Sequence, residues 1–163
     1  SHMANALEIA KTTIFELILV SLFTNEEYNL VEYNRLFNDF ENNIVCEIDV
    51  VIHKNATIQI LNCKDADLSY DRLRDWFGYT VPLVHSVLTR QRRNEGVQKF
   101  HYVYCSSAQA DQSIRDLVSS IKSSELPYTV DFLDVSDLNN LVKTNPSLET
   151  LFNMLCPAPL TEL

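Results

Sequence analysis

Four polar side chains lie within or beside two apolar, β-branched runs near the middle of the chain. The runs span residues 48–52 and 57–61, and the polar pair Lys54-Asn55 lies between them, a pattern typical of a β-hairpin with a tight turn. Two carboxylates, an amide and an ammonium are costly to bury in an apolar hairpin without partners. Together they indicate a functional site. The four residues are Glu47, Asp49, Asn62 and Lys64.

The position of the turn decides which of these side chains face each other. We take residues 54–55 as the two turn residues. Asp49 then lies opposite Ile60, and Glu47 lies opposite Asn62. Because side chains alternate between the two faces of a sheet, all four polar side chains are then expected to share one face.

The arrangement resembles the core of the PD-(D/E)xK nuclease superfamily, in which an Asp on one hairpin strand is followed on the next by an acidic residue, any residue and Lys. Asp49 stands at the Asp position, and Asn62 and Lys64 stand at the acidic and lysine positions. In this family the carboxylates hold a divalent metal that activates water against a phosphodiester, while the lysine stabilises the developing charge. The resemblance implies that these three residues are the catalytic positions. It also implies Mg²⁺ or Mn²⁺ as the cofactor of an active domain, and none otherwise.

Asn62 departs from the family pattern. An amide oxygen can ligate a hard cation but brings no charge, so the affinity for metal should fall steeply. Glu47, predicted to lie opposite Asn62, could supply the missing carboxylate; the alternative is a solvent-facing residue at the start of a strand, and a different turn would remove the pairing. We therefore expect impaired or absent catalysis and a role in nucleic-acid binding or protein interaction. The alternatives are an active metal-dependent endonuclease acting on DNA or RNA, and a structural or assembly domain unrelated to nucleic acid.

Glu16 is a further candidate metal ligand. Apolar residues recur at spacings of three and four from Ala6 to Phe23, which predicts an amphipathic helix. Mrr-like branches of the superfamily often carry a Phe-Glu pair near the middle of the first helix, and Phe15-Glu16 is similar to it. The resemblance places Glu16 with Asp49 and Glu47 in the metal site. The alternative is an ordinary glutamate at the edge of the apolar face of the helix.

A local concentration of positive charge follows a predicted helix. In a nuclease-like fold it predicts a nucleic-acid backbone contact, because Arg forks match phosphate geometry. The alternative is a solvated helix C-terminus, where cations complement the helix dipole. The formal net charge of the chain is -9, which opposes long-range attraction to nucleic acid, so any such binding must be local. The patch consists of Arg90, Arg92, Arg93 and Lys99.

The order of the predicted elements indicates an α/β fold. We expect a restriction-endonuclease-like, three-layer α/β/α architecture with a central mixed β-sheet, and the resemblance covers roughly residues 9–141. The predicted strands span residues 48–52, 57–61, 99–105 and 128–133. The predicted helices span residues 6–23, 31–40, 68–78, 82–93, 110–121, 136–142 and 148–155.

The length of 163 residues suits one domain, which we place at residues 4–156. Residues 1–3 (Ser-His-Met) resemble the remnant of an expression tag, so the natural start of the chain is unknown. Residues 157–163 are predicted to form a flexible tail.

The cysteines and apolar residues indicate the compartment and the kind of partner. The four cysteines lack CxxC spacing, which favours free thiols in a reducing, intracellular compartment, cytoplasmic or nuclear. The longest apolar stretch, residues 14–23, is too short to span a bilayer, so no membrane contact is expected. Aromatic residues such as Tyr28, Tyr33 and Phe37 predict a surface for a protein partner or a homodimer.

Overall fold

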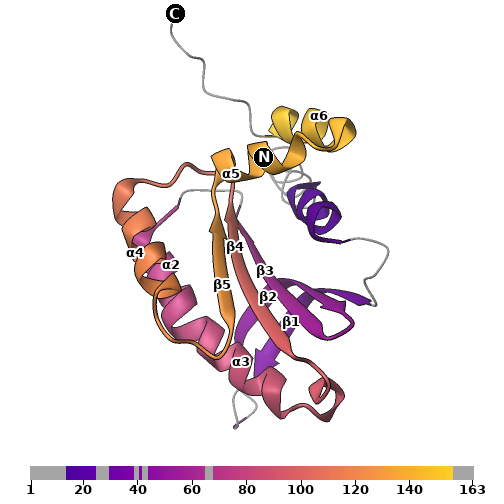
Figure 1. Cartoon of the computed structure of the whole chain (residues 1–163), viewed down its shortest axis with the longest axis vertical. Coiled ribbons are helices and arrows are strands. Elements are labelled where there is room, and N and C mark those ends of the chain that lie inside the picture. The colour runs from indigo at the N-terminus through magenta and orange to yellow at the C-terminus, as the bar shows by residue number, and fades with distance from the viewer. Residues whose placement is uncertain (1–13, 25–29, 39–40, 42–43, 65–67, 156–163) are drawn as a thin grey trace, which may run out of the picture.

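The computed structural model describes residues 14–24, 30–38, 41, 44–64 and 68–155. Within these ranges a five-stranded sheet in the order β1-β2-β3-β4-β5 lies between two layers of helices (Figure 1). β1, β2 and β3 are antiparallel, whereas β4 and β5 run parallel to β3. The predicted fold class, a three-layer α/β/α architecture with a mixed central sheet, is confirmed. The strands are β1 (Leu30–Asn38), β2 (Ile44–Lys54), β3 (Thr57–Lys64), β4 (Lys99–Ser106) and β5 (Thr129–Leu133).

One face of the sheet is covered by α2, η1, α3 and α4 (Figure 1). Their bounds are Tyr70–Asp75 for α2, Trp76–Thr80 for the π-helical turn η1, Val81–Arg90 for α3 and Gln112–Lys122 for α4. Apolar residues of α2, η1 and α3 recur three or four positions apart and form one stripe that packs on β3 and β4. The buried members of the stripe are Leu73, Trp76, Phe77, Val81, Val84 and Leu88.

The segment from α2 to α3 is continuously helical, although the sequence predicted two helices with a boundary near residues 78–82. Pro82 lacks a backbone N–H and cannot make the usual helical hydrogen bond. The chain accommodates it by widening the preceding turn into η1, where the N–H of Val81 bonds the carbonyl of Trp76. The side chain of Ser69 caps the start of α2 by accepting a hydrogen bond from the backbone of Arg72.

The other face of the sheet is covered by the helix at residues 14–23, α5 (Val135–Val142) and α6 (Pro146–Leu155). Phe15, Ile18 and Leu19 of the first of these helices pack with apolar side chains of β2 and β3. This confirms the predicted amphipathic helix over residues 14–23, and its earlier part, residues 6–13, lies outside the described residues. The predicted tag remnant at 1–3 and tail at 157–163 also lie outside them. No helix of the described residues is long and apolar enough to cross a membrane.

The helix predicted over residues 31–40 was wrong for the described part, because residues 30–38 form the edge strand β1. The helical spacing of Tyr33, Leu36 and Phe37 was misleading. Phe37 is only 2% exposed, whereas Tyr33 and Leu36 are 46% and 52% exposed, so the three do not form one buried stripe. Phe37 is therefore not available as a partner surface, while Tyr33 is; Tyr28 lies outside the described residues.

The predicted hairpin register was also wrong. Lys54 pairs with Thr57, so the two turn residues are Asn55 and Ala56. Asn55 has a φ of 45°, a left-handed conformation that Asn tolerates better than most residues, which favours it as the first turn residue. Because the turn lies one residue later than predicted, each residue of β3 pairs with a β2 residue two positions later than predicted. Val51, not Asp49, lies opposite Ile60.

Candidate binding site at the end of the central hairpin

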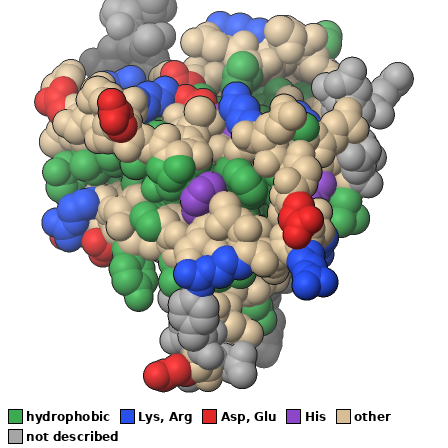
Figure 2. Space-filling model, turned by 60° about the horizontal axis from the view of Figure 1, so that its bottom comes forward, with side chains coloured by type: hydrophobic (Ala, Val, Ile, Leu, Met, Phe, Trp, Pro, Cys, Tyr) green, Lys and Arg blue, Asp and Glu red, His purple; other side chains and the backbone are tan. Residues whose placement is uncertain are grey.

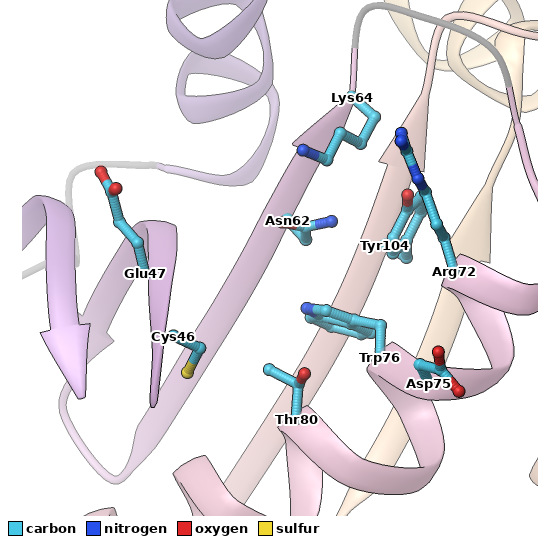
Figure 3. A pocket seen from close by; sticks show the side chains of 9 residues that line it. All are labelled: Cys46, Glu47, Asn62, Lys64, Arg72, Asp75, Trp76, Thr80 and Tyr104. Atoms are coloured by element: carbon cyan, nitrogen blue, oxygen red, sulfur yellow. The ribbon is translucent and has the colours of Figure 1, made fainter. Parts of the chain in front are cut away.

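A cleft of about 270 Å³ opens where the start of β2 and the end of β3 meet α2 and η1 (Figure 3). On the sheet side, β2 contributes Cys46 and Glu47, β3 contributes Asn62 and Lys64, and β4 contributes Tyr104. The structure thus brings together Glu47, Asn62 and Lys64, three of the four polar residues predicted to form a site. Asn62 is 6% exposed, so its amide belongs to the buried floor of the cleft, whereas Lys64 is exposed at the rim.

The helical side of the cleft is built by Arg72 and Asp75 of α2 and by Trp76 and Thr80 of η1. Trp76 is 7% exposed and makes an edge contact with the ring of Tyr104, with the ring centroids 5.4 Å apart. Arg72, Asp75 and Trp76 were predicted only as parts of a helix, and Thr80 fell between two predicted helices. Their role in the site depends on the packing of α2 and η1 over β3 and β4, which no local pattern in the sequence reveals.

Asp49 lies beside the cleft and does not line it. Its Oδ2 accepts a hydrogen bond from the backbone N–H of Cys63, at 2.8 Å. The alternation of side chains along β2 is interrupted here, because Ile48 and Val51 both pack in the cluster under α2 and α3 while Val50 packs on the opposite face. One carboxylate oxygen of Asp49 therefore already accepts a hydrogen bond from the backbone of β3.

Three carboxylates, which we call the acidic cluster, interact electrostatically near the first half of β2: Glu47 and Asp49 on the strand, and Glu16 on the helix at residues 14–23. Burial raises the pKa of Glu16, and the charges of Asp49 and Glu47 raise it further. Burial also raises the pKa of Asp49, although the Cys63 N–H and the charge of Lys64 oppose that shift. The acidic cluster is thus under-compensated by positive charge.

The acidic cluster contains the predicted metal ligands, but it does not fit Mg²⁺ or Mn²⁺ in this arrangement. Hard divalent cations need several oxygen ligands at short range, with carboxylates carrying most of the charge. Among the described residues, no group of three or more His, Cys, Asp or Glu side chains is gathered closely enough to hold a metal ion. Asn62 supplies a neutral amide and no charge, and one oxygen of Asp49 is bonded to the backbone of β3.

The predicted basic patch lies at the far end of the sheet from the cleft. Lys99 pairs with Thr57 at the start of β3, whereas Lys64 pairs with Ser106 at its end. Seven residues of a strand at about 3.3 Å each separate the two lysines by roughly 23 Å. The patch and the cleft therefore cannot contact the same phosphate group.

Within the patch, Arg90 ends α3, Arg92 and Arg93 lie in the 3₁₀ turn η2 (Arg92–Asn94), and Lys99 begins β4. Arg93 is 51% exposed on its side chain and lies 3.7 Å from a carboxylate oxygen of Glu32. On the face that Figure 2 presents, Lys and Arg side chains occur as separate groups among hydrophobic and uncharged ones. Positive charge is thus local on this face.

Comparison with known proteins adds little to this geometry. No protein-family model matches the chain, and no curated protein sequence matches it. Among solved structures it is similar to the small subunit (R.BspD6I2) of the heterodimeric restriction endonuclease R.BspD6I, with 14% identity, a TM-score of 0.46, and coverage of 86% of this chain and 76% of that one. A likeness this slight carries no inference about activity, substrate or partner.

Proposed function

We propose that this chain is a nuclease-like α/β/α domain that has lost, or nearly lost, metal-dependent cleavage and binds nucleic acid. The observation that carries the proposal is Asn62, a neutral amide on the buried floor of the cleft where the family pattern requires a carboxylate. The hydrogen bond that Asp49 accepts from Cys63 supports it, because a carboxylate oxygen held by the backbone is a poorer ligand for a cation.

The surface proposed for nucleic acid is the basic patch at the start of β4. Arg90, Arg92, Arg93 and Lys99 are exposed there, and contacts of this kind go to phosphates without reading sequence. With an acidic net charge on the whole chain, binding through so few cations should be weak, and its salt dependence should be set by the few phosphates that these cations contact.

The proposal is tested by mixing the purified domain with labelled single-stranded and duplex DNA and RNA in Mg²⁺ and in Mn²⁺. We expect retention of the oligonucleotide without cleavage. Substituting Arg92 and Lys99 by Ala should weaken binding to all sequences alike and reduce the slope of affinity against salt by about one for each lost contact. Lys143→Ala, an exposed cation at the end of α5 and outside both the patch and the cleft, is the matched control and should leave the slope unchanged.

An active endonuclease is the second candidate, and the acidic cluster favours it. Glu16, Glu47 and Asp49 act on one another electrostatically, and Lys64 acts on Asp49, as an acidic site with its lysine would require. This candidate needs Mg²⁺ or Mn²⁺ and a rearrangement that brings more of these oxygens together. Cleavage that disappears in Lys64→Ala but persists in Lys99→Ala would establish it and overturn the proposal above.

A further inference from the structure

Another cavity, of about 380 Å³, lies between the end of α4 and the start of β5. Its volume falls within the roughly 300–1,000 Å³ typical of ligand pockets. The loop that joins α4 to β5 lies at the same end of the sheet as the start of β4, where the basic patch begins (Figure 1). We call this cavity the side pocket. The residues that line it are Lys122, Ser124, Leu126, Tyr128, Thr129 and Val130.

The side pocket offers apolar surface to a flat ring. Leu126 is 37% exposed and Tyr128 is half-buried, and both side chains line the pocket. The ring of Tyr128 is fixed by aromatic contacts with His85 and Tyr102, whose ring centroids lie 4.8 Å and 5.0 Å from its own. Aromatic side chains on which bases stack are the usual means by which proteins bind single strands.

The hydroxyl groups of the side pocket act as acceptors toward a ligand. Ser124 Oγ donates to the carbonyl of Ser120 at 3.0 Å, and Thr129 Oγ1 donates to the carbonyl of Phe100 at 3.4 Å. A hydroxyl that has given its one proton to the backbone keeps lone pairs that accept a further hydrogen bond. The side pocket therefore favours a ring that carries an N–H donor, and the exocyclic amine of adenine is such a donor.

The lining of the side pocket adds no net charge, and the neighbouring positive charge is Lys99. Lys122 is the charged residue of the lining, and its ammonium lies 2.6 Å from Asp131. Glu125 is exposed in the same loop but does not line the pocket. Lys99 lies two residues before the β4 residue that pairs with Thr129, so the Cα atoms of these two residues are roughly 8 Å apart. A strand whose phosphate meets Lys99 can therefore place an attached base in the side pocket.

We propose that the side pocket takes one unpaired base of a single strand whose phosphates contact the basic patch, with adenine preferred for its amine. This inference rests on the proposed nucleic-acid binding and names single strands as its substrate class. In a duplex the base is stacked between its neighbours and its amine is paired, so entering a pocket requires that it first be unpaired and unstacked. A single strand offers the ring and the amine without that cost.

The inference is tested by fluorescence anisotropy on the whole domain with three short labelled probes at one salt concentration. The probes are single-stranded oligo(dA), the same strand with hypoxanthine in place of adenine, and the oligo(dA)·oligo(dT) duplex. Hypoxanthine keeps the fused rings but replaces the amine by a carbonyl. Oligo(dA) should bind about three- to tenfold more tightly than the hypoxanthine strand, because one hydrogen bond is lost. It should also bind more tightly than the duplex, although the duplex has the denser charge.

A pair of variants assigns the preference to the side pocket. Thr129→Val combined with Ser124→Ala removes both acceptors with little change of shape, and should abolish the preference for adenine over hypoxanthine. Thr144→Val combined with Ser147→Ala, at exposed positions near the start of α6, is the matched control and should leave that preference intact.

Three results would overturn the inference while leaving the basic patch in place. They are equal affinity for the single strand and the duplex, equal affinity for adenine and hypoxanthine, and an adenine preference that survives loss of both acceptors. Failure of every probe to bind would instead overturn the proposed function, and this inference with it.

Discussion

The pKa values of partly buried carboxylates shift in opposite directions at the outer edge of the sheet and in the acidic cluster. At the edge, Glu32 is bonded by Arg35 at 3.0 Å and lies 3.3 Å from His53, with Arg93 close by. Burial acts to raise the pKa of Glu32, but the His53 hydrogen bond and the charges of Arg35, His53 and Arg93 hold it below the ordinary value. The carboxylate is stabilised in its charged form.

Asp131 on β5 follows the same rule, with Lys122 and His101 at 2.6 Å and 2.7 Å from its oxygens and its pKa lowered despite burial. In the acidic cluster, by contrast, the pKa values of Glu16 and Asp49 are raised. Cationic side chains thus outweigh the effect of burial on the pKa values of Glu32 and Asp131, but not on those of Glu16 and Asp49. Charge left uncompensated beside a cleft is a common mark of a functional site.

Asn62→Glu should have the largest effect, because it adds a buried carboxylate next to the under-compensated acidic cluster. We expect a loss of about 2–4 kcal/mol in the free energy of unfolding, independent of metal. Urea unfolding followed by Trp76 fluorescence measures this, with Asn62→Gln as the uncharged control. A variant that Mn²⁺ stabilises would show instead that the cluster and Lys64 can still assemble a metal site.

Glu32→Gln should have the next largest effect. It replaces the charged partner of Arg35, whose side chain is 15% exposed, with a neutral amide and leaves that cation without its counter-charge. The expected loss at neutral pH is about 1.5 kcal/mol, the low end of the range for a hydrogen bond to a charged group. No loss would mean that the cations around Glu32 compensate its charge no better than the charges of the acidic cluster are compensated. Thermal unfolding of the two proteins in the same buffer decides between these results.

Glu16→Gln should change stability in the opposite direction by a smaller amount. Removing one of the mutually repelling carboxylates is expected to raise the free energy of unfolding by roughly 0.5 kcal/mol, since a partly exposed group is screened by solvent. Destabilisation of similar size would indicate that Glu16 makes a favourable contact in the folded state. Because the gain is small, chemical unfolding with replicate midpoints is the suitable measurement.

The stability of Glu16→Gln and of Glu32→Gln, each relative to wild type, should change with pH in opposite directions. This is the smallest of the expected effects. The raised pKa of Glu16 makes its contribution fully favourable below its unfolded value, about pH 4.3, and that contribution is lost as the pH rises through the folded value. The lowered pKa of Glu32 makes its contribution present above the unfolded value and lost as the pH falls through the folded one. Stability relative to wild type should therefore rise with pH for Glu16→Gln and fall with pH for Glu32→Gln.

The sequence predicted the layers of the fold better than the geometry of the site. Hydrophobic spacing was sufficient for the buried helices and for β4, where packing and local pattern agree. It failed at β1, because an edge strand with an exposed Tyr33 and Leu36 mimics helical spacing. The left-handed turn residue Asn55 and the interrupted alternation at Asp49 depend on backbone conformation, which residue types alone do not determine.

The candidate site was predicted in part for the same reason. Glu47, Asn62 and Lys64 lie close in the sequence pattern of one hairpin, so their convergence followed from local reasoning. Trp76 was predicted as part of an apolar helix, and the unpaired state of its nitrogen depends on the exact packing of η1 over β4. Long-range contacts of this kind leave no periodic signal in the chain.

We propose that the acidic cluster does not form a metal site, and a Mn²⁺ titration of wild-type thermal stability tests this most directly. A ligand that binds only the folded state stabilises it by about 2.7 kcal/mol at one hundred times its dissociation constant, which is easily detected. We expect the unfolding temperature of the wild type to stay flat across the titration and to match the flat response of Asp49→Ala. A saturable rise in the wild type that Asp49→Ala abolishes would contradict the account.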